Sequence, residues 1–148
     1  MPAATERTTR QEAETTGVFL FPLANLQPSQ LYISEAKLAR ILARWQPPTL
    51  NTLEPVPIRQ LNGRVIYTDG HTRAIAAYRS GFDEVPVNWD EDELDWEAYQ
   101  ICVDWCLDKG IRTIADLGGR IITPEQYEVL WHDRCRVMQT ELALGRSQ

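Results

Sequence analysis

Five consecutive residues near the middle of the chain carry groups suited to holding an anion. They are Asp69, Gly70, His71, Thr72 and Arg73, and they supply a carboxylate, an imidazole, a hydroxyl and a guanidinium. The guanidinium of Arg73 presents a planar fork of hydrogen-bond donors that fits a phosphate or a carboxylate group. So dense a mixture of groups predicts a binding site for a negatively charged ligand.

The flanking residues place this motif between a strand and a helix. Residues 65–67 are a short apolar run typical of a strand, and Asp69-Gly70 is a turn dipeptide in which glycine supplies backbone freedom. Residues 71–78 have apolar side chains at helical spacing. The motif therefore falls at a helix N-terminus, whose unpaired N–H groups and partial positive charge favour anions.

A purely structural interpretation of the same residues stays open at this point. Asp69 is a common type of helix N-cap, Gly70 is a common turn residue, and Arg73 is an ordinary surface charge. Short motifs also match by chance. The sequence alone gives the two interpretations similar weight.

The pattern around the motif predicts an α+β fold with a small mixed sheet and helices in residues 18–89. Strands are expected at 18–21, 56–61, 64–68 and 85–89, and helices at 35–45 and 71–78. Asn62-Gly63 between two apolar runs is typical of a hairpin turn. Ser34 is a plausible N-cap, and Pro57 suggests that its strand lies at an edge or begins there.

Residues 90–148 predict helices only, at about 95–108, at 111–117 and from 124 onward. Thr123, Pro124 and Gln126 match the capping signal of a helix N-terminus. Apolar stripes on these helices indicate that they pack on the sheet unit. We therefore expect a disordered tail at 1–17 and one domain at 18–148, with an α/β core (18–89) and a helical extension (90–148).

Charge and composition narrow the classes of partner. The chain has 148 residues and a net charge of −6, with many acids between residues 83 and 104, which argues against a large nucleic-acid surface. We see neither an apolar run of membrane-spanning length nor a signal peptide. The odd count of three cysteines fits a reducing, cytoplasmic location. A small-molecule or nucleotide ligand, or a protein partner, is the expectation.

The order strand, D-G-H-T-R-A, helix and then a Val-Pro-Val strand at 85–87 resembles the ParB/sulfiredoxin superfamily. Its members place a G-x-x-R motif between a strand and a helix and bind nucleotide phosphates there. The proline-bearing loop and helix at 26–45 are similar in order and spacing, so the resemblance covers residues 18–89. Sulfiredoxins have a catalytic cysteine where this chain has His71. The ParB branch has a DNA-binding segment that this chain does not show.

Within the superfamily, the motif is most similar to that of the free serine kinases. The similarity implies that Asp69 and His71 lie near a transferring phosphoryl group. It implies that Gly70 and Thr72 offer donors and that Arg73 holds a phosphate. The implied cofactor is a nucleotide, ADP/ATP or CTP, with Mg²⁺ held by Asp69.

Such kinases also activate the substrate hydroxyl with a glutamate from the loop after the first strand. The matching position in this chain is Gln30, and a glutamine cannot accept that proton. Glu35 is the candidate substitute, five residues further along. The departure at Gln30 bears directly on whether the chain transfers a phosphoryl group.

A second group of residues has metal-ligand types. Cys102, Cys106, His132 and Cys135 lie on two helices and amount to a tetrahedral zinc set if those helices are antiparallel neighbours. The spacing is unusual for zinc, and the same positions fall on apolar stripes, where cysteine packs as a small hydrophobe. Packing is the favoured interpretation.

The leading hypothesis is a nucleotide- or phosphate-binding ParB/sulfiredoxin-like protein, extended to a small-molecule phosphotransferase with Asp69, His71 and Glu35 as the catalytic candidates. The alternative is a non-catalytic interaction or regulatory module, and a DNA-associated protein is the weakest option.

Overall fold

The structure is a computed structural model that describes residues 17–147, so the predicted tail lies outside the described residues apart from Gly17. The strands are β1 (Phe19–Pro22), β2 (Ile33–Ser34), β3 (Val56–Leu61), β4 (Arg64–Tyr67), β5 (Glu84–Trp89) and β6 (Ile121–Ile122). The α-helices are α2 (Glu35–Arg44), α3 (His71–Arg79), α4 (Trp96–Asp108), α5 (Pro124–Tyr127) and α6 (Asp133–Arg146). Short helical turns lie at η1 (Leu23–Asn25), η2 (Leu50–Thr52), η3 (Ile114–Leu117) and η4 (Glu128–His132).

The main sheet has four strands in the order β1-β5-β3-β4. β5 runs antiparallel to β1 and parallel to β3, and β3 runs antiparallel to β4, so the sheet is mixed. The predicted α+β class is confirmed. Pro57 does not mark an edge strand, because β3 lies inside the sheet. It is the second residue of β3, which agrees with the other expectation, a strand start.

The β3–β4 hairpin has the turn that its sequence predicts. Asn62 and Gly63 have φ angles of 49° and 79°, and both values are positive as in a type I′ turn. The turn sets Leu61 opposite Arg64 and brings the end of β4 beside the start of β3. The motif at residues 69–73 follows directly from this edge of the sheet.

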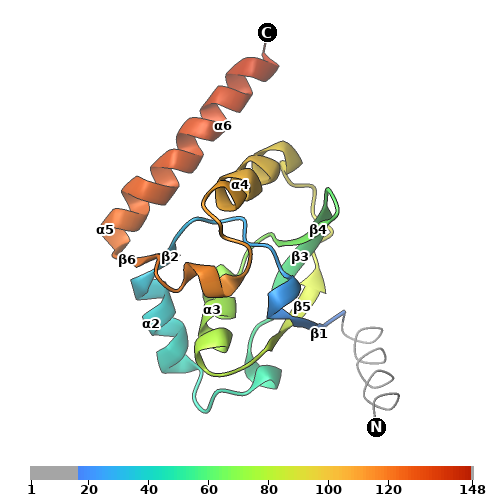
Figure 1. Ribbon diagram of the computed structural model, residues 1–148, viewed down its shortest axis with the longest axis vertical. Coiled ribbons are helices and arrows are strands. Elements are labelled where there is room, and N and C mark those ends of the chain that lie inside the picture. Colours follow the sequence, from blue (N-terminus) through green and yellow to red (C-terminus); the bar gives the residue numbers. More distant parts are fainter. Residues whose placement is uncertain (1–16, 148) are drawn as a thin grey trace.

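The helices α2 and α3 lie side by side, and α3 packs against β3 and β5 of the main sheet (Figure 1). Ser34 caps α2 as expected, because its side chain accepts a hydrogen bond from the amide of Lys37. The helix ends at Arg44, one residue before the predicted end, and Trp45 is its C-cap. The helix α3 buries its alanine face completely, with Ala74, Ile75 and Ala77 fully enclosed.

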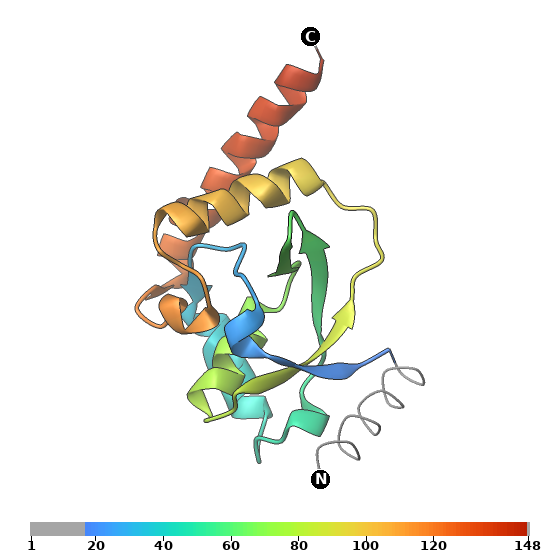
Figure 2. The ribbon, with the colours of Figure 1, turned by 45° about the vertical axis from the view of Figure 1, so that its right-hand side comes forward.

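The helical extension crosses one side of this unit. Asp95 caps α4 through a hydrogen bond from the amide of Ala98, and Thr123 and Gln126 form the predicted capping box at α5. In Figure 2, α4 crosses above the sheet and α6 continues past it. Among residues 17–147, no helix has both the length and the apolar character that a membrane span requires.

A short parallel strand pair joins the extension to the core, and the sequence did not predict it. β2 pairs with β6 through Ile33 and Ile121. The side chain of Gln27 also donates to the carbonyl of Ile111 (2.8 Å), and the Nε of Arg120 donates to the carbonyl of Leu31 (2.7 Å). The buried core runs without a break from the sheet into the extension, and Leu117 is fully enclosed in it.

We expect Leu117→Ala to lower the free energy of unfolding of the whole chain by about 2–5 kcal/mol in one transition, because it leaves a cavity in the shared core. Leu144→Ala is the matched control, since Leu144 is 61% exposed in the same extension. Denaturant unfolding followed by circular dichroism measures both. Two separate transitions, with only one of them shifted, would contradict a single domain.

Candidate functional site

The N-terminus of α3 is built around a glycine. Gly70 is the N-cap, with φ at 80°, and no side chain within the described range 17–147 caps the helix. Asp69 instead accepts a hydrogen bond from the amide of Gly70 itself (2.8 Å), so the interpretation of Asp69 as the helix cap is wrong. The described part of the chain offers no acceptor to the first-turn amides of His71, Thr72 and Arg73. These amides are the donors that an anion at a helix N-terminus uses.

Arg73 folds back across Gly70. A Cβ atom at position 70 would lie 2.8 Å from Nη2 of Arg73, so a side chain there would displace the end of Arg73, and the positive φ itself favours glycine. Nη2 donates to the carbonyl of Pro55 (3.3 Å), and Nη1 lies 3.6 Å from a carboxylate oxygen of Glu54. The Nε atom is buried and has no partner within residues 17–147. The guanidinium is therefore largely fixed, with donor capacity to spare.

Basic side chains from α2 complete one wall of a hollow in front of this helix end. Lys37, Arg40 and Arg44 lie on one face of α2, at intervals of three and four residues, and Arg73 faces them from α3. The hollow has a volume of about 370 Å³, within the usual range for small-molecule sites. Its remaining lining residues are Gln30, Ile41, Asp69, Gly70, His71, Thr72 and Tyr127.

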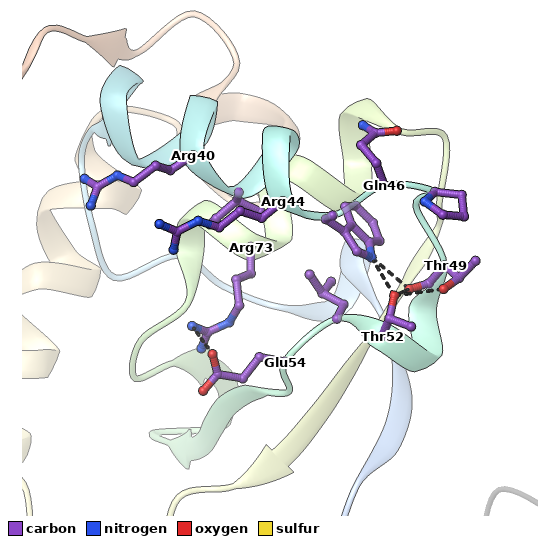
Figure 3. Close-up of a pocket in the computed structure, with 11 residues that line it drawn as sticks. Arg40, Arg44, Gln46, Thr49, Thr52, Glu54 and Arg73 are labelled. Atoms are coloured by element: carbon purple, nitrogen blue, oxygen red, sulfur yellow. Dashed lines mark hydrogen bonds and ion pairs between the residues drawn. The ribbon is translucent and has the colours of Figure 1, made fainter.

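A second hollow, of about 390 Å³, continues along α2 and shares Arg40, Arg44 and Arg73 with the first. Figure 3 shows the two arginines of α2 on one side and the paired side chains of Arg73 and Glu54 on the other. Trp45 also lines the second hollow. Its indole N–H donates to the carbonyl of Thr49 (2.9 Å). Arg73 is thus one of the residues that line both hollows.

His71 lies at the base of the motif as a buried, uncharged group. Its Nε2 accepts a hydrogen bond from the amide of Ser29 (3.0 Å), which leaves the proton on Nδ1. Nδ1 is itself buried and has no partner among the described residues. Burial lowers the pKa of His71 from 6.5 to about 3, although the charge of Asp69 acts in the opposite direction. The ring therefore ties the loop at Ser29 to α3.

The structure brings together most of the predicted site residues. Asp69, Gly70, His71, Thr72 and Arg73 all line the first hollow, and Gln30 lies there too, donating to the carbonyl of Tyr32 (2.8 Å). Glu35 does not line it. Glu35 is exposed in the first turn of α2, outside the hollow in which a phosphoryl group is expected.

The sequence pattern does not identify Lys37, Arg40 and Arg44 as site residues. Basic residues at this spacing on a helix look the same whether they face solvent or a ligand. What distinguishes these three is the packing of α2 beside α3, which turns their face toward the motif.

Of the four residues with metal-ligand types, Cys102 and Cys135 contact each other through a hydrogen bond between their thiols, and the other two have separate partners. His132 pairs with Glu128 on the surface (2.6 Å), while Cys106 is fully buried, with its thiol 3.5 Å from the carbonyl of Gln30. Cys102 is buried and Cys135 half-buried. Within residues 17–147, no three His, Cys, Asp or Glu side chains group as metal ligands do.

Comparison with known proteins finds similarity to solved structures but no match in sequence. No family model matches the chain, and neither does any curated protein. Among solved structures, the chain is similar to protein Atu1540 from Agrobacterium tumefaciens, with 13% identity and a TM-score of 0.47 over 68% of this chain and 61% of that one. It is also similar to the C-terminally truncated chromosome-partitioning protein ParB from Caulobacter crescentus complexed with CTP-γ-S. Here the identity is 23% and the TM-score 0.42, over 62% of this chain and 53% of that one.

The matched region spans less than two thirds of each of these two proteins. With TM-scores below 0.5, neither likeness assigns a ligand or an activity to this chain.

We expect the folded chain to keep His71 neutral at about pH 5, where an unfolded histidine is mostly charged. The lowered pKa means that the stabilising contribution of the neutral ring is complete above about pH 6.5 and is lost as the pH falls toward 3. Nitrogen-15 NMR of the imidazole measures both protonation and tautomer. A His71 ring that titrates near its ordinary pKa in the folded chain would contradict the buried hydrogen bond to Ser29.

Proposed function

We propose that the hollow at the N-terminus of α3 binds the phosphate groups of a nucleotide or of a phosphorylated small molecule. One observation carries the proposal. Lys37, Arg40, Arg44 and Arg73 converge on a single hollow in a chain whose net charge is −6. Like charges at close range repel one another, and an anion between them relieves that repulsion.

The donors at this helix end suit a phosphate in particular. The amides of His71, Thr72 and Arg73 point out of the first turn of α3, where the helix dipole adds partial positive charge. Arg73 contributes a guanidinium held against Gly70, so little side-chain freedom is lost when a ligand binds. Asp69 is the single carboxylate among the lining residues.

The extent of the basic face favours a ligand larger than one phosphate. Arg44 comes seven positions after Lys37, which corresponds to roughly 10 Å along a helix. A polyphosphate or a nucleotide spans such a distance. The ParB structure noted above is complexed with CTP-γ-S, so CTP belongs with ADP and ATP among the ligands to test.

Phosphoryl transfer to a small hydroxyl acceptor is the enzymatic form of this proposal. Mg²⁺ in such sites uses one or two carboxylates together with phosphate oxygens, so Asp69 fits as its protein ligand, and the ion neutralises phosphate charge. Arg73 and the α3 amides would hold the phosphoryl group, and Thr72 would add a hydroxyl donor.

A non-catalytic nucleotide-binding module is the second candidate function, and one observation favours it. Gln30 occupies the hollow where the resemblance calls for a proton-accepting glutamate, and Glu35 lies outside. An amide side chain cannot take the proton of an attacking hydroxyl. Binding without turnover is the outcome that this arrangement favours.

We expect Arg73→Ala to weaken binding of the best ligand among ADP, ATP and CTP by about 10-fold or more, since charged hydrogen bonds to phosphate contribute about 1.5–3 kcal/mol. Arg79→Ala is the matched control, because Arg79 is exposed at the opposite end of the same helix. Isothermal titration calorimetry with Mg²⁺ measures both. If wild-type protein binds none of the three nucleotides and no inorganic pyrophosphate, the proposed function is wrong.

We expect Mg²⁺ to strengthen nucleotide binding in the wild type and to have little effect in Asp69→Asn, because the variant loses the charged metal ligand. Titrations with and without EDTA give the comparison. Equal dependence on Mg²⁺ in both proteins would remove Asp69 from the metal-binding role. Phosphorus-31 NMR of the same mixtures with serine and other small hydroxyl compounds reports any transfer.

A further inference from the structure

Glu54 brings a negative charge into the second hollow, which is otherwise lined by arginines and uncharged residues. It is the single carboxylate among the residues that line this hollow, whose other charged members are Arg40, Arg44 and Arg73. Its carboxylate lies 3.6 Å from Nη1 of Arg73, and Figure 3 shows the two side chains directed toward each other. The contact therefore joins a residue of the second hollow to one that lines both hollows.

The side chains of Arg73 and Glu54 differ in how firmly the surrounding protein holds them. Arg73 is 20% exposed, lies across Gly70 and donates to the carbonyl of Pro55. The side chain of Glu54 is 79% exposed. The guanidinium of Arg73 is therefore held in place, whereas the carboxylate of Glu54 is free to move away from it.

A carboxylate also resembles part of the ligand that the site is proposed to bind. Two oxygens bearing negative charge present the same acceptors to a guanidinium fork as two phosphate oxygens do. Asp69, the other carboxylate nearby, is engaged by the amide of Gly70. Glu54 is thus the acidic group placed to compete for Arg73.

We propose that Glu54 regulates the anion site as an internal competitor, pairing with Arg73 until the phosphate of a ligand displaces it. The inference rests on the proposed function and adds to it a built-in limit on affinity. An exposed ion pair is weak, which allows displacement, and an anion that binds through Nη1 of Arg73 must break it.

The expected effect of removing the competitor is modest and specific. We expect Glu54→Gln to tighten binding of inorganic pyrophosphate, or of the nucleotide that binds best, by about two- to fivefold. Glu84→Gln is the matched control. It removes the same charge at an exposed position that lines neither hollow, and should change the affinity by much less.

A double-mutant cycle tests whether the effect passes through Arg73. In an Arg73→Ala background, Glu54→Gln should give no more gain than Glu84→Gln, because the competing contact no longer exists. Calorimetry at one ionic strength measures all the variants, and circular dichroism confirms that each is folded. The same gain with and without Arg73 would overturn the inference, since a general electrostatic effect would then explain it.

The other outcomes separate the inference from the function on which it rests. If wild type binds pyrophosphate or nucleotide but Glu54→Gln binds equally well or more weakly, Glu54 does not compete and the proposed function stands. If neither the wild type nor Glu54→Gln binds any of these ligands, the proposed function fails, and the inference with it.

Discussion

The candidate site depends on a single close contact, the packing of the Arg73 side chain against the backbone of Gly70. A Cβ atom at residue 70 would displace the end of the Arg73 side chain from this place, and the left-handed backbone at the same residue favours glycine. Because glycine begins the helix without a capping side chain, the first-turn amides stay available. One residue therefore both positions the guanidinium and leaves the amides open to a ligand.

Buried polar contacts hold the strand end and the neighbouring loop in place around this helix end. The backbone of Gln27 pairs with Val65 and Tyr67 of β4, and the hydroxyl of Ser29 donates to the carbonyl of Tyr67 (2.7 Å). The amide of Ser29 in turn donates to His71. Such contacts are strong in a low-dielectric interior and costly to leave unmade, so they fix the loop that carries Gln30. The role of His71 in the structure is to anchor this loop, while its predicted catalytic role stays a prediction.

The sequence predicts those parts of this site that depend on local rules. A turn dipeptide between a strand and a helix locates Asp69 and Gly70, and Asn62-Gly63 locates the hairpin that leads to them. The basic wall follows from tertiary packing, since Lys37, Arg40 and Arg44 become a binding surface once α2 lies beside α3. The β2–β6 pair could not be predicted either, because two residues such as Ile33–Ser34 are too few to show a strand pattern. A proline in a strand is compatible either with an edge strand or with the start of a strand. For Pro57 the edge expectation is wrong and the start expectation holds, because β3 lies inside the sheet and Pro57 is its second residue.

The site is expected to be a strongly local positive region in an acidic molecule, and NMR of the backbone amides tests this most directly. In a titration with pyrophosphate or the best-bound nucleotide, the backbone amide resonances of His71, Thr72 and Arg73 should show the largest shifts, because the ligand becomes their hydrogen-bond acceptor. If other resonances shift to saturation while those of these three amides stay unchanged, the ligand does not bind at the N-terminus of α3.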